Sequence, residues 1–132
     1  MSTNPEGFSV VLENFARKHY YKDFEKNYAQ WGVTWKGLEE TLIRFNPDAL
    51  VGKLEPPIKI ADKGNLVLYK MSFRVAGTDK SAKSSGNRLI FVCNYPEQVI
   101  RVLLMYDKNH VKGKRETDWW MSLIYDEYKG LP

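Results

Sequence analysis

Three apolar runs between residues 66 and 106 constrain the fold of this chain more than any other feature. The first run reads LVLYKMSFRVAG, and its odd-numbered positions from 67 to 75 are all apolar. A period of two is the signature of a strand with one buried face, so we expect Lys70 and Arg74 to share the opposite face. The other two runs, GNRLIFVCNY and QVIRVLLMY, flank Pro96. Because proline fixes φ in a turn, these runs predict an antiparallel hairpin.

The second and third runs are apolar on both of their faces. A strand of this kind is buried on both sides, so we expect both runs to be central strands of a sheet. Helices are expected to cover one face of that sheet. A partner, a loop or a ligand is expected to cover the other face.

Two helices are expected before the sheet, because aromatic and aliphatic residues recur there at helical spacing. The first covers residues 14 to about 30 with Asn14 as its N-cap, and the second begins with Thr34 as its cap and stops at Asn46-Pro47. The expected fold class is therefore α+β, with a helical hairpin packed on a small antiparallel sheet and a short C-terminal helix that contains Trp119 and Trp120.

Three further segments carry weaker signals. Residues 8–13 are β-branched in part and predict either an edge strand or the entry to the first helix, and residues 58–60 predict a short strand. Residues 76–86 are small, polar and basic, which is typical of a mobile loop.

Length and cysteine content bound the class of protein. A chain of 132 residues with 43% hydrophobic content has the size of one domain with a real core, so we expect a single domain over residues 1–132. Its apolar stretches fall well short of the roughly 20 residues that a membrane span requires. The start, MSTNPEGFSV, lacks a basic region followed by an apolar one, which favours a soluble chain without an address signal. The single cysteine, Cys93, is expected to be a buried thiol in a reducing cytoplasm.

Charge is concentrated on the predicted sheet and its loops. Residues 70–115 hold ten lysines and arginines but only three acidic residues, a local net charge of +7. A field of one sign on one side of a small domain favours a polyanionic partner, and nucleic acid is the commonest. The alternative is that the lysines only make the loops soluble.

Several kinds of catalytic site are absent from the sequence. With only His19, His110 and Cys93, and no metal-ligand spacing, neither a metal nor another cofactor is expected. Gly77 and Gly86 flank a loop but do not open a helix, so a nucleotide-binding loop is not indicated either. No spacing suggests a Ser-His-Asp or Cys-His arrangement.

The remaining constellation of basic residues resembles a known family. The segments YKMSFRVAG and GNRLIFVCNYPEQVIRVLLMYDKNH are similar to the core of RelE-like toxins of the RelE/ParE toxin-antitoxin superfamily. The resemblance covers roughly residues 15–125. It implies a compact α/β domain that acts as a metal-independent endoribonuclease, cuts mRNA on the ribosome, and is held by a cognate antitoxin protein.

Carried over by position, the resemblance implies that the catalytic residues are Lys70, Arg74, Arg88, Lys108, Tyr106 and His110. The other basic residues of the region are expected to contact RNA, namely Lys80, Lys83, Arg101, Lys112, Lys114 and Arg115. The chain departs from the family at Ser72, where some members carry a second lysine, and at Asn109, where an arginine is frequent. Two alternatives stay open: a ParE-like inhibitor of a protein target such as DNA gyrase, and a basic nucleic-acid-binding adaptor.

RNA cleavage without a metal is chemically reasonable because RNA supplies its own nucleophile, the 2′-OH next to the scissile phosphate. Guanidinium groups stabilise the charge that develops on the phosphorus centre, and a lysine crowded by other cations has a lowered pKa that suits proton transfer. We therefore expect Lys70, Arg74 and Arg88 to line one concave basic surface. Arg88→Ala is expected to abolish toxicity and leave the fold intact, and RNA binding is expected to weaken steeply with salt. The alternative for these residues is that they only hold phosphates or pair with Asp107 and Glu97.

Overall fold

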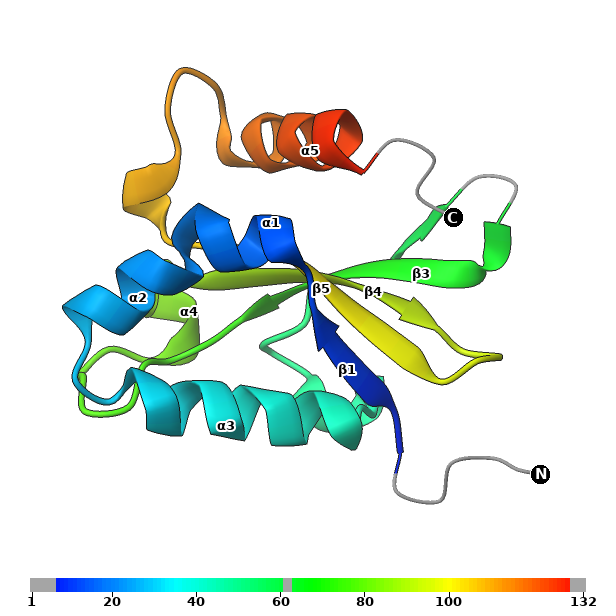
Figure 1. Cartoon of the computed structure of the whole chain (residues 1–132), viewed down its shortest axis with the longest axis horizontal. Coiled ribbons are helices and arrows are strands. Elements are labelled where there is room, and N and C mark those ends of the chain that lie inside the picture. Colours follow the sequence, from blue (N-terminus) through cyan, green and yellow to red (C-terminus); the bar gives the residue numbers. More distant parts are fainter. Residues whose placement is uncertain (1–6, 61–62, 129–132) are drawn as a thin grey trace.

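A five-stranded sheet with helices on both faces forms the centre of the molecule (Figure 1). This computed structural model describes residues 7–60 and 63–128. The strands run in the order β1-β5-β4-β3-β2, with bounds Ser9–Leu12 for β1, Ile58–Ile60 for β2, Lys63–Ser72 for β3, Arg88–Asn94 for β4 and Val99–Tyr106 for β5. Among the described residues, no helix has the length and apolar character to cross a membrane.

The expected α+β class is confirmed, and the three apolar runs form the adjacent strands β3, β4 and β5. Residues 58–60 form β2, as predicted. Residues 8–13 contain the edge strand β1 and are not a helix entry. One correction concerns strand direction, because β1 pairs with β5 in parallel and only the other neighbours are antiparallel. The sheet is therefore mixed.

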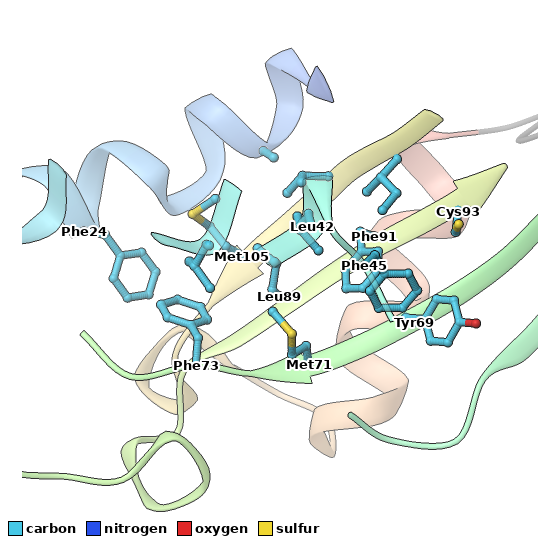
Figure 2. Close-up of a cluster of buried hydrophobic side chains, with 14 of the residues drawn as sticks. Phe24, Leu42, Phe45, Tyr69, Met71, Phe73, Leu89, Phe91, Cys93 and Met105 are labelled. Carbon is cyan, nitrogen blue, oxygen red and sulfur yellow. The ribbon is translucent and has the colours of Figure 1, made fainter. Parts of the chain in front are cut away.

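The first face of the sheet packs against α3, which spans Trp31–Ile43 (Figure 1). The odd-numbered residues 67–75 all lie in this core, as their alternation predicted. Figure 2 shows how aromatic and aliphatic side chains from β3, β4, β5 and the helices fill it. Cys93 is fully buried here as a free thiol, and burial raises its pKa to about 12.

The second face packs against α5, which spans Glu116–Glu127 and lies across the sheet from α3 (Figure 1). Trp119, Trp120 and Ile124 of this helix are buried against Ile90 and Leu104 of the sheet. The expected C-terminal helix is thus present. The chain itself supplies the cover that we expected a partner, a loop or a ligand to provide.

A bulge in β5 changes which side chains face α5. Ile90 pairs with Leu104, but the next residue of β4, Phe91, pairs with Val102, so Leu103 is the extra residue. Before the bulge, Val102 belongs to the core next to α3; after it, Met105 belongs to that core. Because one extra residue reverses the alternation, Tyr106 faces α5.

The first half of the helical hairpin is interrupted, contrary to the expected continuous helix. Its segments are α1 (Asn14–Ala16), η1 (Arg17–Tyr21) and α2 (Lys22–Asn27), and the backbone leaves helical geometry at His19 and Tyr20. Tyr20 has a φ of 100°, an unfavourable region for a residue with a side chain. The break lets Phe15 pack on the α5 side while Phe24 packs on the α3 side.

The expected helix caps are also corrected. Glu13, not Asn14, precedes α1, and α3 begins before Thr34. The Thr34 hydroxyl lies inside the helix, where it donates to the Gln30 carbonyl and accepts the Ala76 backbone N–H. Thr34 therefore links α3 to the loop that follows β3.

The segment 76–86, expected to be a mobile loop, contains the short helix α4 (Ala82–Ser85). Ser81 and Ser84 close a capping box at its start, and the Ser85 hydroxyl donates to the Phe73 carbonyl. Two single 3-10 turns, η2 (Pro47–Leu50) and η3 (Lys108–His110), complete the regular elements of the described residues.

We expect Phe91→Ala to lower the free energy of unfolding by about 3–5 kcal/mol, because the ring is fully buried on a central strand and its removal leaves a cavity. Tyr125→Ala is the matched control, since Tyr125 is 76% exposed. It should change stability by less than about 0.5 kcal/mol. Urea denaturation of both variants measures this, and equal effects would contradict the described core.

Candidate functional site

Lys70, Arg88 and Tyr106 lie on three adjacent strands and point to the face covered by α5. Arg88 of β4 pairs with Ser72 of β3 on one side and with Tyr106 of β5 on the other. Lys70 is two residues before Ser72, so it shares the same face. We call these three residues the donor cluster. The resemblance placed all three in the catalytic set, and the fold brings them together.

The donor cluster converges on the carboxylate of Glu116, the first residue of α5. The Tyr106 hydroxyl donates a hydrogen bond of 2.6 Å to Glu116 Oε2. The Lys70 Nζ lies 3.1 Å from the same oxygen, and Arg88 Nε lies 3.9 Å from it. Lys70 is also 3.4 Å from Oε2 of Glu55. Two cations and two carboxylates therefore share this site.

The expected concave basic surface is not what the structure shows at Lys70 and Arg88, because both side chains are largely buried and paired with carboxylates. Tyr106 is 0% and Arg88 7% exposed, and only 10% of the Lys70 side chain reaches solvent. Glu55 and Glu116 both lie outside the basic segment 70–115, so sequence reasoning missed both carboxylates. The sequence signal that could have identified Glu116 is its position at the start of the helix that packs on the sheet. Glu55 has no comparable signal.

The protonation states of the site follow from these contacts. Partial burial works to raise the pKa of Glu116, but the hydrogen bonds from Tyr106 and Lys70 and the positive charges of Lys70 and Arg88 outweigh it, so this pKa is lowered. Burial, together with the hydrogen bond to Glu116 and the charge of Glu116, raises the pKa of Tyr106. Glu116 is thus ionised at neutral pH, and Tyr106 keeps its proton.

Arg88 is held by the loop before β4 as well as by Glu116. Its Nη1 donates to the Asn87 carbonyl at 2.9 Å and its Nη2 to the Lys83 carbonyl at 3.3 Å. Its Nε is buried and has no hydrogen-bond partner. Arg88 is 7% exposed, and its truncation would remove these donors from two carbonyls. From the structure we therefore expect Arg88→Ala to lower stability, which differs from the sequence-based expectation that the fold stays intact.

The other three residues of the catalytic set lie outside the donor cluster. Arg74 is exposed and donates through Nη2 to the Thr78 carbonyl at 2.6 Å. Lys108 is exposed, and its alkyl chain packs on Gly86, where a Cβ would lie 3.1 Å from Lys108 Cγ. Gly86 ends α4 with a φ of 81°, so a side chain there would be strained and would also press on Lys108.

His110 has both ring nitrogens engaged. Its Nδ1 accepts the backbone N–H of Asp107 at 3.0 Å, and its Nε2 lies 3.3 Å from Asp23 Oδ2. Its ring stacks on that of Tyr20, with centroids 3.9 Å apart. This fixed position links η3 to the break in the first helix.

The residues expected to contact RNA divide by exposure. Those that are exposed are Lys80, Lys83, Lys112, Lys114 and Arg115. Arg101 is half-buried and pairs with Glu13 through a 2.8 Å contact. The exposed lysines and arginine are accessible to a polyanion, whereas Arg101 joins β5 to the end of β1.

Within residues 7–60 and 63–128, no group of three or more His, Cys, Asp or Glu side chains is placed to hold a metal ion.

Comparisons with known proteins found few similarities. No family model matches the chain, and no curated protein matches it. Among solved structures, it is similar to a chain in the crystal structure of the archaeal RelE–RelB complex from Pyrococcus horikoshii. The two are 15% identical with a TM-score of 0.47, over 80% of this chain and 99% of that chain.

We expect Glu116→Gln to lower the free energy of unfolding at pH 7 by about 1–3 kcal/mol, because it leaves buried cationic donors with a neutral partner. The pKa of Glu116 is lowered in the folded chain, so its contribution is complete above the ordinary value of 4.5 and is lost as pH falls through the lower folded value. The difference between wild type and variant should therefore shrink below about pH 4.5.

Urea denaturation from pH 7 to pH 3 measures this difference. Glu127→Gln is the control, because it removes the same charge from an exposed position of α5. A difference between wild type and Glu116→Gln that stays constant with pH would contradict the proposed ion pairs.

Proposed function

We propose that this chain is the toxin component of a type II toxin-antitoxin pair and acts in the cytoplasm as a metal-independent endoribonuclease that cleaves mRNA at the ribosome. The motif resemblance and the α+β architecture support the proposal. The observation that carries it is the donor cluster, in which two cations and a phenol from three strands converge on one carboxylate oxygen. The oxygens of a phosphate group are also suitable acceptors for these donors.

In the proposed reaction, the RNA 2′-oxygen attacks the adjacent phosphorus while the bond from phosphorus to the 5′-oxygen breaks, which leaves a 2′,3′-cyclic phosphate and a free 5′-hydroxyl. Lys70 and Arg88 stabilise the negative charge on the phosphorane. Tyr106, which keeps its proton, donates it to the departing 5′-oxygen. We assign Lys108, in its unprotonated form, as the acceptor of the 2′-OH proton, since it is exposed beside the loop that carries Arg88.

The exposed basic residues around this site are proposed to hold the RNA backbone. Lys83 belongs to α4, and its carbonyl binds Arg88, so its side chain starts next to the donor cluster. Lys80, Lys112, Lys114 and Arg115 extend the basic charge along the loops on either side. Phosphate contacts of this kind position RNA without reading its sequence.

The proposed protein partner is an acidic or amphipathic antitoxin. An open groove of about 370 Å³ lies between α3 and the end of β3, and its lining contains Lys53 and Arg74 but no acidic residue. Val33 on its rim is 63% exposed. On α5, Met121 and Tyr125 present a second exposed apolar strip at helical spacing. Apolar contacts flanked by cations suit an acidic amphipathic segment.

A second candidate function is favoured by the pairing of Lys70 and Arg88 with carboxylates. If these pairs only stabilise the fold, the chain is a non-catalytic binding protein, either an inhibitor of a protein target such as DNA gyrase or a nucleic-acid adaptor. Mapping the 5′ ends of mRNA after induction distinguishes these two functions, because only a ribonuclease creates new ends.

We expect Tyr106→Phe to lower the rate of RNA cleavage by at least about a hundredfold, because it removes the proposed proton donor. The ring stays in place against Trp119, and the loss of one hydrogen bond should cost only about 1 kcal/mol of stability. Cleavage is measured by mapping the 5′ ends of mRNA after induction of wild type and of the variant. Tyr125→Phe is the control, since its side chain is exposed. An undiminished rate in Tyr106→Phe would place the chemistry elsewhere.

We also expect RNA affinity to depend on the exposed lysines through salt. For single-stranded RNA, removing one lysine–phosphate interaction should reduce the slope of log K against log salt by about 0.7. The variant Lys80→Ala/Lys83→Ala/Lys112→Ala should therefore bind more weakly and with a flatter salt profile than wild type. Lys36→Ala, which removes an exposed lysine from α3, should leave the slope unchanged. Equal slopes for all three proteins would argue against a role for these lysines.

A further inference from the structure

All three residues of the donor cluster contact the same acceptor atom. The contacts from Tyr106, Lys70 and Arg88 all end on Glu116 Oε2. Each donor comes from a different strand of a rigid sheet, so their mutual arrangement is set by strand pairing and not by Glu116. Glu116, in contrast, comes from a separate element that follows η3 and the loop 111–115. The sheet therefore holds a preformed set of donors, and α5 supplies the acceptor.

The carboxylate does not satisfy all of these donors. Tyr106 and Lys70 reach it at hydrogen-bonding distances, but Arg88 Nε remains 3.9 Å away and has no hydrogen-bond partner although it is buried. A buried donor without a partner is costly, and it is rare in a site built for its occupant. A phosphate group is larger than a carboxylate and is tetrahedral, so its oxygens reach separate donors. A phosphate at this position can meet Lys70, Tyr106 and Arg88 Nε together.

The same geometry closes the site. Tyr106 and Arg88 are almost fully buried under the start of α5, and the Lys70 ammonium lies between Glu55 and Glu116. A polyanion cannot contact these groups while the Glu116 carboxylate occupies the position between them. Binding of an anion therefore requires Glu116 to leave.

We infer that the Glu116 carboxylate is an internal ligand of a phosphate-binding site formed by Lys70, Arg88 and Tyr106, and that an RNA phosphodiester binds there by displacing it. The identification of the phosphate as that of RNA rests on the proposed function. The competition itself rests on the contacts of Glu116. Because Glu116 belongs to α5, this competition lowers the affinity of the chain for RNA below the value that the donor cluster alone would give.

The test compares wild type with Glu116→Gln, which keeps the size of the side chain and removes its charge. The main probe is a short 2′-O-methyl oligoribonucleotide, which presents RNA phosphates but has no free 2′-OH and cannot be cut. Inorganic phosphate is the second probe, and binding is followed by titration calorimetry. Glu127→Gln is the control for net charge on α5.

We expect Glu116→Gln to bind the oligonucleotide at least tenfold more tightly than wild type, and Glu127→Gln to bind it within about twofold of wild type, because an exposed charge is screened by salt. Adding Lys70→Met to Glu116→Gln should abolish the gain, since it removes a donor of the site. Equal gains in Glu116→Gln and Glu127→Gln would overturn the inference, as would no gain in Glu116→Gln.

If circular dichroism shows that Glu116→Gln does not fold, Glu116→Asp replaces it in the experiment. This variant keeps the charge, but its side chain is shorter by one methylene, so the carboxylate is withdrawn from the donors. An affinity for the oligonucleotide at least threefold higher than that of wild type supports the displacement, and an unchanged affinity overturns it. A gain for inorganic phosphate without one for the oligonucleotide overturns RNA as the ligand. Because the oligonucleotide is never cut, failure of wild type to cleave any RNA would reject the ribonuclease proposal and leave this result unaffected.

Discussion

The burial of both faces of β4 and β5 is the constraint on which the rest of the structure depends. Two apolar faces require two helical layers, which α3 and α5 supply. Any charged residue on these central strands is then carried under a helix and must find a counter-charge there. Arg88 of β4 and Lys70 of the neighbouring strand β3 are in this position, and Glu116 is the partner that the covering helix brings to them. The ion pairs of the site are thus a consequence of how the core is closed.

Sequence reasoning identified the parts of this arrangement that depend on local periodicity. The alternation of residues 67–75 predicted the orientation of β3, and the uninterrupted apolar runs indicated central strands. The resemblance selected Lys70, Arg88 and Tyr106, which the fold does bring together. It also selected Arg74 and His110, which lie outside the donor cluster. Arg74 contacts Thr78, and His110 contacts Asp23 and Asp107.

The rest depends on interactions between distant segments, which periodicity does not encode. The bulge at Leu103 reverses the alternation of β5 and turns Tyr106 toward α5, although nothing in the run VIRVLLMY distinguishes Leu103 from its neighbours. The break at Tyr20 is similarly hidden in a regular helical pattern. There the left-handed backbone is stabilised by stacking of the ring on His110, a residue 90 positions away. Local sequence patterns cannot anticipate either contact.

Stability and chemistry make opposite demands on the donor cluster. A site that stabilises negative charge in a reaction needs cations that are desolvated and fixed before the substrate arrives. Such cations are costly in a free protein, because burial removes their water and nothing else compensates. A carboxylate that leaves when the substrate enters resolves the conflict, since the charges are paired in both states. Glu116 meets this requirement because it is ionised at neutral pH and is attached to a different element from the donors that it pairs.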